Sequence, residues 1–156
     1  MPSTSEMWRR IVLYLSVAIT GGAVMVLELL GTRIIGPFYG VSLYVWSSLI
    51  AVTMIALATG YYLGGWCADH LPRLRLAHLL VLSATATLLI PLVSGHVLTA
   101  TDAMGMKAGA FVSAMALFLV PLTCLGMVGP LVIKLATQSL DGVGTAAGSV
   151  YAVSTI

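Results

Sequence analysis

The sequence predicts an all-α membrane protein with four complete transmembrane helices and the start of a fifth. Hydrophobic residues make up 60% of the 156 positions and charged residues only 8%, whereas soluble domains carry about 25% charged residues. The mean hydropathy is +1.07. The apolar stretches are continuous and lack the alternation of a transmembrane β-strand. Helices are therefore expected, because lipid cannot satisfy open backbone groups.

Four apolar stretches are long enough for a span of about 20 residues. They cover residues 11–30, 42–67, 76–98 and 108–133. A fifth stretch, 142–156, is too short to cross a membrane unaided. We expect an incomplete helix there, and a chain that is a fragment or one piece of a larger assembly. The domain organisation expected is one transmembrane module, 1–156, without a soluble domain.

Positive charges gather at one end of this predicted bundle. Arg9, Arg10, Arg73, Arg75 and Lys134 lie on one side, and Arg33 and Lys107 on the other. Because basic residues favour the cytoplasmic side, the N-terminus is predicted to be cytoplasmic. The net charge of +2 and the lack of a basic stripe argue against nucleic acid as a partner. The cysteines show no metal-binding spacing, so no metal is expected. The sequence contains no strand followed by a glycine-rich turn and a helix, so no nucleotide cofactor is expected either.

Glu28 places a carboxylate near the end of the first apolar stretch, and Arg33 follows five residues later. An ionised acid at the membrane centre costs about 2.5–3.5 kcal/mol on insertion scales. A helix that enters near Ile11 and rises 1.5 Å per residue would carry Glu28 close to the outer interface. Its helical neighbours include Gly21 and Thr32, so the acid is expected to face the bundle.

Three interpretations of Glu28 remain open. It could form a structural pair with Arg33 or Lys107, it could be a substrate or proton site together with Arg33, or it could be an exposed interfacial charge. On a continuous helix Glu28 and Arg33 are badly phased for a pair. Pro37 cannot extend a helix in the ordinary way, so a broken helix end between residues 31 and 41 is expected.

Small residues recur at four-residue spacing in two of the stretches. Ala56, Gly60 and Gly64 form the first row, and Gly144 and Gly148 the second. This spacing lines one face of a helix and allows another backbone to approach closely, which predicts helix packing.

The segment GGWCADHLPRLRL, residues 64–76, predicts a tight cytoplasmic turn. It is similar to the loop between the second and third helices of major facilitator transporters, where an acid and basic residues latch the helices in one conformation. The resemblance implies such a latch at Gly65, Asp69, Arg73 and Arg75, although His70 and Pro72 depart from the usual pattern. A plain turn with Asp69 beside the arginines or capping a helix is the alternative. His78 and His96 are isolated and indicate core or interface positions.

Four segments together resemble the membrane domain of bacterial spermidine-synthase-like membrane proteins, also described as fused major facilitator/spermidine synthase proteins. The segments are LELLGTRIIGPFYGVSLYVWSS, ATGYYLGGWCADH, GPLVIKL and GTAAGSVYAVSTI. The first carries an E-L-x-x-x-R-x-x-x-P-x-x-G pattern. The resemblance implies the bacterial inner membrane and a soluble aminopropyltransferase-like domain with a Rossmann-type core after the helices. The catalytic residues of that family belong to the soluble domain, and none of them matches a position in this sequence. The resemblance therefore leaves open whether the protein is an enzyme.

Three functions follow as hypotheses. The chain could be the membrane module of a spermidine-synthase-like protein, anchoring the enzyme domain or providing it with a small-molecule pathway. It could instead be part of a major-facilitator-like transporter of a cationic small molecule. It could also be a small structural subunit of a membrane complex. The expected partners are the lipid bilayer and either further helices, a soluble Rossmann-type domain or other subunits.

Overall fold

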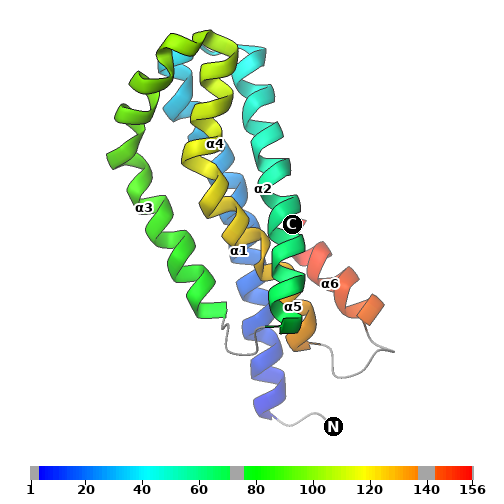
Figure 1. The fold of residues 1–156 in the computed structure, drawn as a ribbon. Helices are drawn as coiled ribbons and strands as arrows, with labels where there is room; N and C mark the ends of the chain where they lie inside the picture. The colour runs from blue at the N-terminus through cyan, green and yellow to red at the C-terminus, as the bar shows by residue number, and fades with distance from the viewer. Residues whose placement is uncertain (1–3, 71–75, 137–142, 156) are drawn as a thin grey trace.

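The computed structural model describes residues 4–70, 76–136 and 143–155, and within these ranges every regular element is a helix. The order is α1 (Thr4–Tyr39), α2 (Leu43–His70), α3 (Leu76–Thr101), the 3-10 helix η1 (Asp102–Met104), α4 (Gly105–Gly126), α5 (Val128–Ala136) and α6 (Val143–Thr155). The helices α1 to α4 run alternately up and down (Figure 1). The all-α class predicted from the sequence is confirmed.

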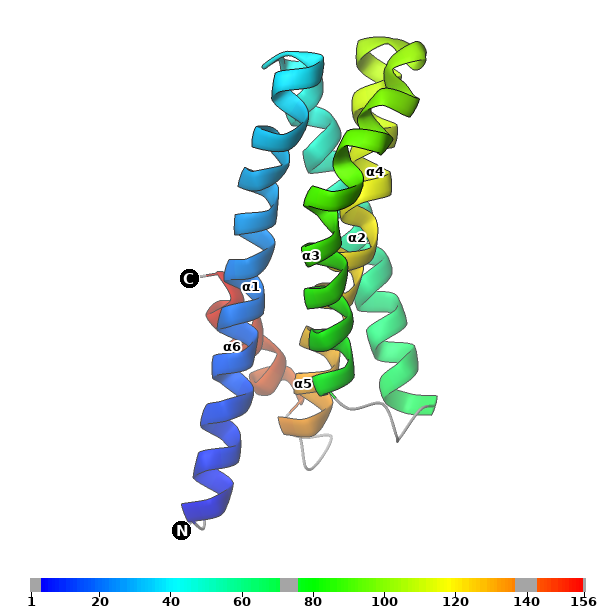
Figure 2. The same cartoon turned by 90° about the vertical axis from the view of Figure 1, so that its left-hand side faces the viewer.

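Three stretches of the described residues are long and apolar enough to cross a membrane: Ile11–Tyr39, Leu43–His70 and Leu76–Ala136. The third contains α3, η1, α4 and α5. It folds back at η1, so that α3 and α4 lie side by side (Figures 1 and 2). The protein thus has the apolar helices of an integral membrane protein. The count of four complete spans and a fifth incomplete one stays a prediction.

The first helix is longer than expected. It continues through the residues predicted to form a broken end and stops at Tyr39, so the turn between α1 and α2 consists only of residues 40–42. Pro37 lies in the last turn of α1, where its ring removes a single backbone hydrogen bond and does not stop the helix. Gly40 ends it, because its φ of 83° is a left-handed conformation that glycine adopts without steric penalty.

The stretch 108–133, predicted as one helix, is divided between α4 and α5 at Met127. Proline explains the position of this break. Pro130 has no N–H to donate to the carbonyl of Gly126, and its ring clashes with that carbonyl in a regular helix. The Met127 N–H still bonds to the Thr123 carbonyl at 3.1 Å, so the axis is interrupted over about one residue.

The helix α4 is the centre of the bundle, since it packs against α1, α2 and α3. Its buried face places Ala110 and Ala114, both 0% exposed, beside the bulkier Phe118 and Leu122. Small residues let neighbouring backbones approach, and the larger side chains fill the space between helices. The helix α6 packs on α1 and α5, and its C-terminal end lies beside the middle of α1 (Figure 2).

Large apolar side chains cover much of the outer surface. On α1 these include Leu15, Ile19, Val26 and Leu29, and on α3 they include Leu88. A soluble monomer rarely exposes so continuous an apolar surface. Lipid tails are as apolar as these side chains, so the outer surface fits a bilayer environment.

Candidate functional site

A groove opens between α1, α2, the α4–α5 junction and α6, with a volume of about 260 Å³. Its walls are mainly apolar and include Val24, Met54, Leu57, Leu125 and Val150. Polar atoms come from Thr20 and Glu28 on α1, Thr53 and Tyr61 on α2, and Tyr151 on α6. Glu28 is the one acidic or basic side chain among the described residues that line it.

Glu28 lies nearer the middle of its apolar helix than the sequence suggested. Because α1 continues to Tyr39, Glu28 is seventeen residues after Ile11 and eleven before Tyr39. It is thus about three residues past the middle of this apolar stretch, which is about 4.5 Å along the axis. Glu28 is therefore nearer the middle of its apolar helix than predicted, and an ionised acid is less tolerated the closer it lies to the centre of a bilayer. The position relative to the outer interface stays a prediction.

The structure pairs Glu28 with neither of the cations proposed for it. Arg33 follows on the same unbroken helix and is exposed, and no ion pair joins it to Glu28. Lys107 lies near the start of α4 with its ammonium 4.5 Å from the centre of the Tyr44 ring. Gly126, which lines the groove, is nineteen residues further along α4, or about 28 Å. Within the part of the chain described, no hydrogen bond or ion pair satisfies the Glu28 carboxylate.

The antiparallel course of α1 and α2 sets which groove residues lie at the same level. Glu28 is twelve residues before Gly40 and Met54 twelve after Ser42, so Glu28 is level with Thr53 and Met54. By the same count Thr20 is level with Tyr61 and Tyr62, of which Tyr61 lines the groove. The groove thus has an acidic end at Glu28 and Thr53 and a second polar end at Thr20 and the tyrosines.

The Thr20 hydroxyl donates its hydrogen bond within its own helix. Its hydroxyl donates to the carbonyls of Ser16 and Val17, at 2.9 and 3.0 Å. The remaining lone pairs on that oxygen can only accept hydrogen bonds. At the same level, the ring of Tyr61 makes an edge-to-face contact with Tyr151, with centroids 6.3 Å apart. This contact closes the groove between α2 and α6.

The α2 row of small residues lies against the α4–α5 junction. Ala56 is 0% exposed. A Cβ added at Gly60 would lie 2.5 Å from the Thr123 carbonyl oxygen, and one at Gly64 would lie 2.7 Å from the Met127 Cα. Backbone meets backbone at both positions, which is the geometry expected of small residues at helix contacts. This close approach brings Gly126 to the wall of the groove.

The second row has different surroundings. A Cβ at Gly144 or at Gly148 would meet no described atom within 4 Å, and both glycines are exposed. Gly65, assigned to the cytoplasmic turn, is equally open. A Cβ can therefore be added at these three positions without a close contact, whereas it cannot at Gly60 or Gly64.

Asp69 has a partner that sequence reasoning missed. The Lys134 ammonium lies 3.0 Å from the Asp69 carboxylate and also donates to the Ala68 carbonyl, so it joins the end of α2 to the end of α5. Both side chains are largely exposed. Arg73 and Arg75, the partners proposed for Asp69, lie outside the described residues. The placement of Lys134 on the same predicted side of the membrane was the signal that could have suggested this pair.

A buried hydrogen-bond chain joins three helices at the opposite end of the bundle, and the sequence analysis did not anticipate it. The Tyr39 hydroxyl lies 2.7 Å from the Thr101 hydroxyl, which lies 2.6 Å from the Ser113 hydroxyl. Buried hydroxyls are satisfied in this way when no water reaches them. The chain fixes α1, α3 and α4 relative to one another and lies away from the groove.

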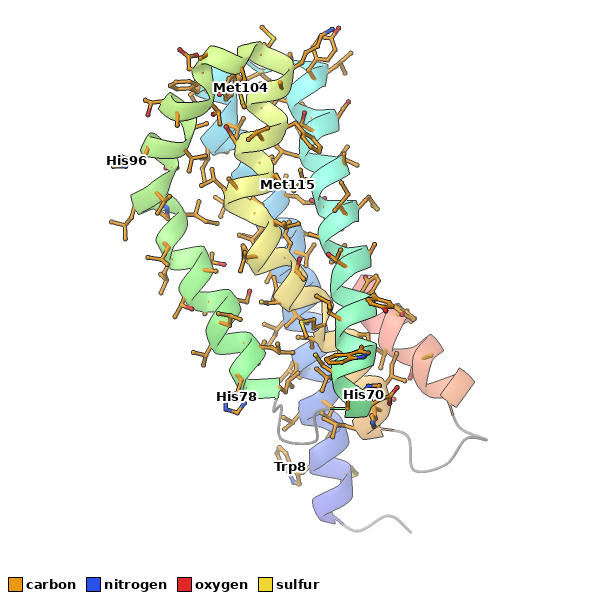
Figure 3. All side chains as sticks on the ribbon, viewed as in Figure 1. Trp8, His70, His78, His96, Met104 and Met115 are labelled. Atoms are coloured by element: carbon orange, nitrogen blue, oxygen red, sulfur yellow. The ribbon has the colours of Figure 1, made fainter. Side chains whose placement is uncertain are left out.

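The histidines do not converge. His70 and His78 lie at the end of the bundle near Trp8, whereas His96 points outward from α3 towards the other end (Figure 3). The His70 ring stacks on Trp66 with centroids 5.0 Å apart. No group of three or more metal-ligating side chains occurs among the residues that the structure covers.

Comparisons with protein-family models, with curated proteins and with solved structures gave no match to this chain. The resemblance to spermidine-synthase-like membrane proteins therefore remains an expectation from the sequence.

Proposed function

We propose that this chain is a membrane-embedded module that binds a small cation at Glu28 and provides a pathway for it within the helical bundle. One observation carries the proposal: a carboxylate without a partner among the described residues lines a groove near the middle of an apolar helix. Acids at this depth are costly and commonly mark substrate, ion or proton pathways. A cation bound in the groove would compensate the charge.

The setting follows from the resemblance. We place the chain as the membrane module of a spermidine-synthase-like protein in a bacterial inner membrane, with its N-terminus in the cytoplasm. The distribution of charge supports the orientation. The first turns of α1, which carry Arg9 and Arg10, lie at the same end of the bundle as the end of α2, the start of α3 and α5 (Figure 1). Lys134 belongs to the last turn of α5, and the two turn arginines fall between α2 and α3 in the sequence. In this setting the groove supplies the small-molecule pathway.

Glu28→Gln tests the proposal, because it keeps the shape of the side chain and removes its charge. We expect the purified variant to lose at least tenfold in affinity for a cation that the unaltered chain binds, in a panel of potassium, n-butylammonium and spermidine. Its thermal stability in detergent should be unchanged or higher, because no described partner is left unpaired and an apolar site is relieved of a charge.

Asp102→Asn is the matched control, since Asp102 is an exposed acid in η1, away from the groove. It should bind the same cation as the unaltered chain does. A Glu28→Gln variant that is destabilised and binds every cation unchanged would show that Glu28 is a structural residue. The proposal would then be wrong.

A further inference from the structure

We infer that the occupant of the groove is a small monovalent organic ammonium ion, with its charged nitrogen at Glu28 and its carbon chain along the apolar walls towards Val150. This inference rests on the proposed function and specifies the class of ligand. It differs from what the resemblance to polyamine enzymes suggests, because the groove is built for one positive charge.

The charge of the groove is the first argument. Glu28 is the single acidic or basic group among the described lining residues, so an ionised Glu28 compensates one positive charge. A polyamine carries further ammonium groups along its chain, and an ammonium between the two polar ends would meet Val24 and Leu57. The hydroxyl groups of Thr20, Tyr61 and Tyr151 at the second polar end supply no negative charge to compensate one placed there. A charge placed against apolar walls without a partner is strongly disfavoured.

The hydrogen-bonding groups of the acidic end suit an ammonium group. A primary ammonium has three donors and no acceptor. The two oxygens of Glu28 accept, and Thr53, which is level with Glu28, adds a hydroxyl oxygen. Calcium prefers six to eight oxygen ligands, and magnesium needs a near-ideal octahedron. The groove offers fewer oxygens at one level than these ions need.

The size and walls of the groove are the third argument. Its volume of about 260 Å³ is just below the range of roughly 300–1,000 Å³ typical of sites for drug-sized ligands. Beyond Glu28 and Thr53 the walls are apolar as far as the level of Thr20 and Tyr61. An alkyl chain gains affinity by leaving water for such walls, whereas a proton or a bare metal ion does not.

A chain-length series tests the inference on the full chain in detergent. Equilibrium dialysis would measure the affinities of methylammonium, n-butylammonium, n-hexylammonium, spermidine and potassium at one pH, with n-hexanol as the uncharged counterpart of hexylammonium. We expect affinity to rise about two- to fourfold for each added methylene until the groove is filled. Spermidine, potassium and hexanol should bind at least tenfold more weakly than hexylammonium.

Gly129→Leu provides a steric test that leaves Glu28 intact. Gly129 lines the groove, and a Cβ there meets no described atom within 4 Å, so we expect a leucine to occupy groove volume, with an unchanged melting temperature as the check that the helices stay in place. The substitution should lower the affinity for hexylammonium at least tenfold and the affinity for methylammonium far less. The matched control is Gly95→Leu on α3, which is equally open and lies away from the groove. It should bind all the amines as the unaltered chain does.

The outcomes separate this inference from the proposed function. Spermidine or potassium binding that depends on Glu28, together with affinities for the amines that do not change with chain length, would overturn the inference and leave the proposed function standing. Amine binding that persists in Glu28→Gln would reflect partition into the detergent or a site elsewhere, and would overturn both. Hexanol binding as tight as hexylammonium would show an apolar or lipid-tail site and overturn the inference.

Discussion

At the scale of single residues, the glycines of α2 differ in the atom that an added side chain would meet. At Gly60 and Gly64 that atom belongs to the backbone of α4 or to Met127, and a backbone cannot rotate away. A Cβ added at Gly65 would have no described atom of another helix within 4 Å. Neighbouring positions of the same residue type therefore have opposite tolerance to substitution.

Gly64→Ala should destabilise the bundle by at least about 1–3 kcal/mol, because its Cβ would lie 2.7 Å from the Met127 Cα and would force the helices apart. Gly65→Ala is the control one residue away and should be neutral or stabilising by up to about 1 kcal/mol, through its better helix propensity. Thermal unfolding in detergent measures both. Equal melting temperatures for the two variants would contradict the packing role of Gly64.

Residue-level reasoning reached some of the site and missed the rest for identifiable reasons. Four-residue spacing pointed to Gly60 and Gly64, because the helical repeat determines which residues share a face. It selected Gly144 and Gly148 by the same criterion, although no described helix covers them. Residue spacing indicates which residues share a helix face, but it does not indicate which helix, if any, packs against that face. Glu28 stood out by its charge, but the groove around it depends on residues of five helices.

At the scale of helices, whether a proline interrupts a helix depends on its position. Pro37, Pro91 and Pro121 all lie inside helices that continue past them. The break at Met127 comes where Pro130 leaves the Gly126 carbonyl without its helical donor. Apolarity predicted which stretches are helical, whereas this break and the extension of α1 to Tyr39 depended on backbone hydrogen bonds that hydropathy does not report.

Gly144 and Gly148 form an open face on α6. Gly148→Leu should leave the melting temperature of the chain itself unchanged, because Gly148 is exposed and a Cβ there meets no described atom within 4 Å. If the face docks further helices or another subunit, the same variant should reduce assembly, measured by size-exclusion chromatography of protein extracted in mild detergent. Gly95→Leu, open on α3, controls for the added apolar surface. A lower melting temperature for Gly148→Leu alone would show that the face packs within the chain.

At the scale of the whole molecule, the arrangement places polar features at different levels of one apolar bundle. The Tyr39–Thr101–Ser113 chain ties three helices together at one end. The Asp69–Lys134 pair joins α2 to α5 at the other end, where exposure limits its contribution to about 0–1 kcal/mol. Glu28 lies between them, beside the groove. Polar contacts thus join neighbouring helices at both ends, whereas the carboxylate between them has no partner among the described residues.

The orientation of the bundle is the last prediction. Arg9 and Arg10 in the first turns of α1, with Lys134, place the excess of basic residues at the end opposite η1 (Figure 1). Basic residues near span ends are retained in the cytoplasm. In a variant with Cys67 and Cys124 replaced by alanine, an impermeant maleimide applied to intact cells should therefore label Asp102→Cys and not Ser5→Cys. Permeabilised cells should show both labelled. Labelling of Ser5→Cys alone in intact cells would reverse the orientation and place the basic end outside, against the retention of positive charge that the prediction assumes.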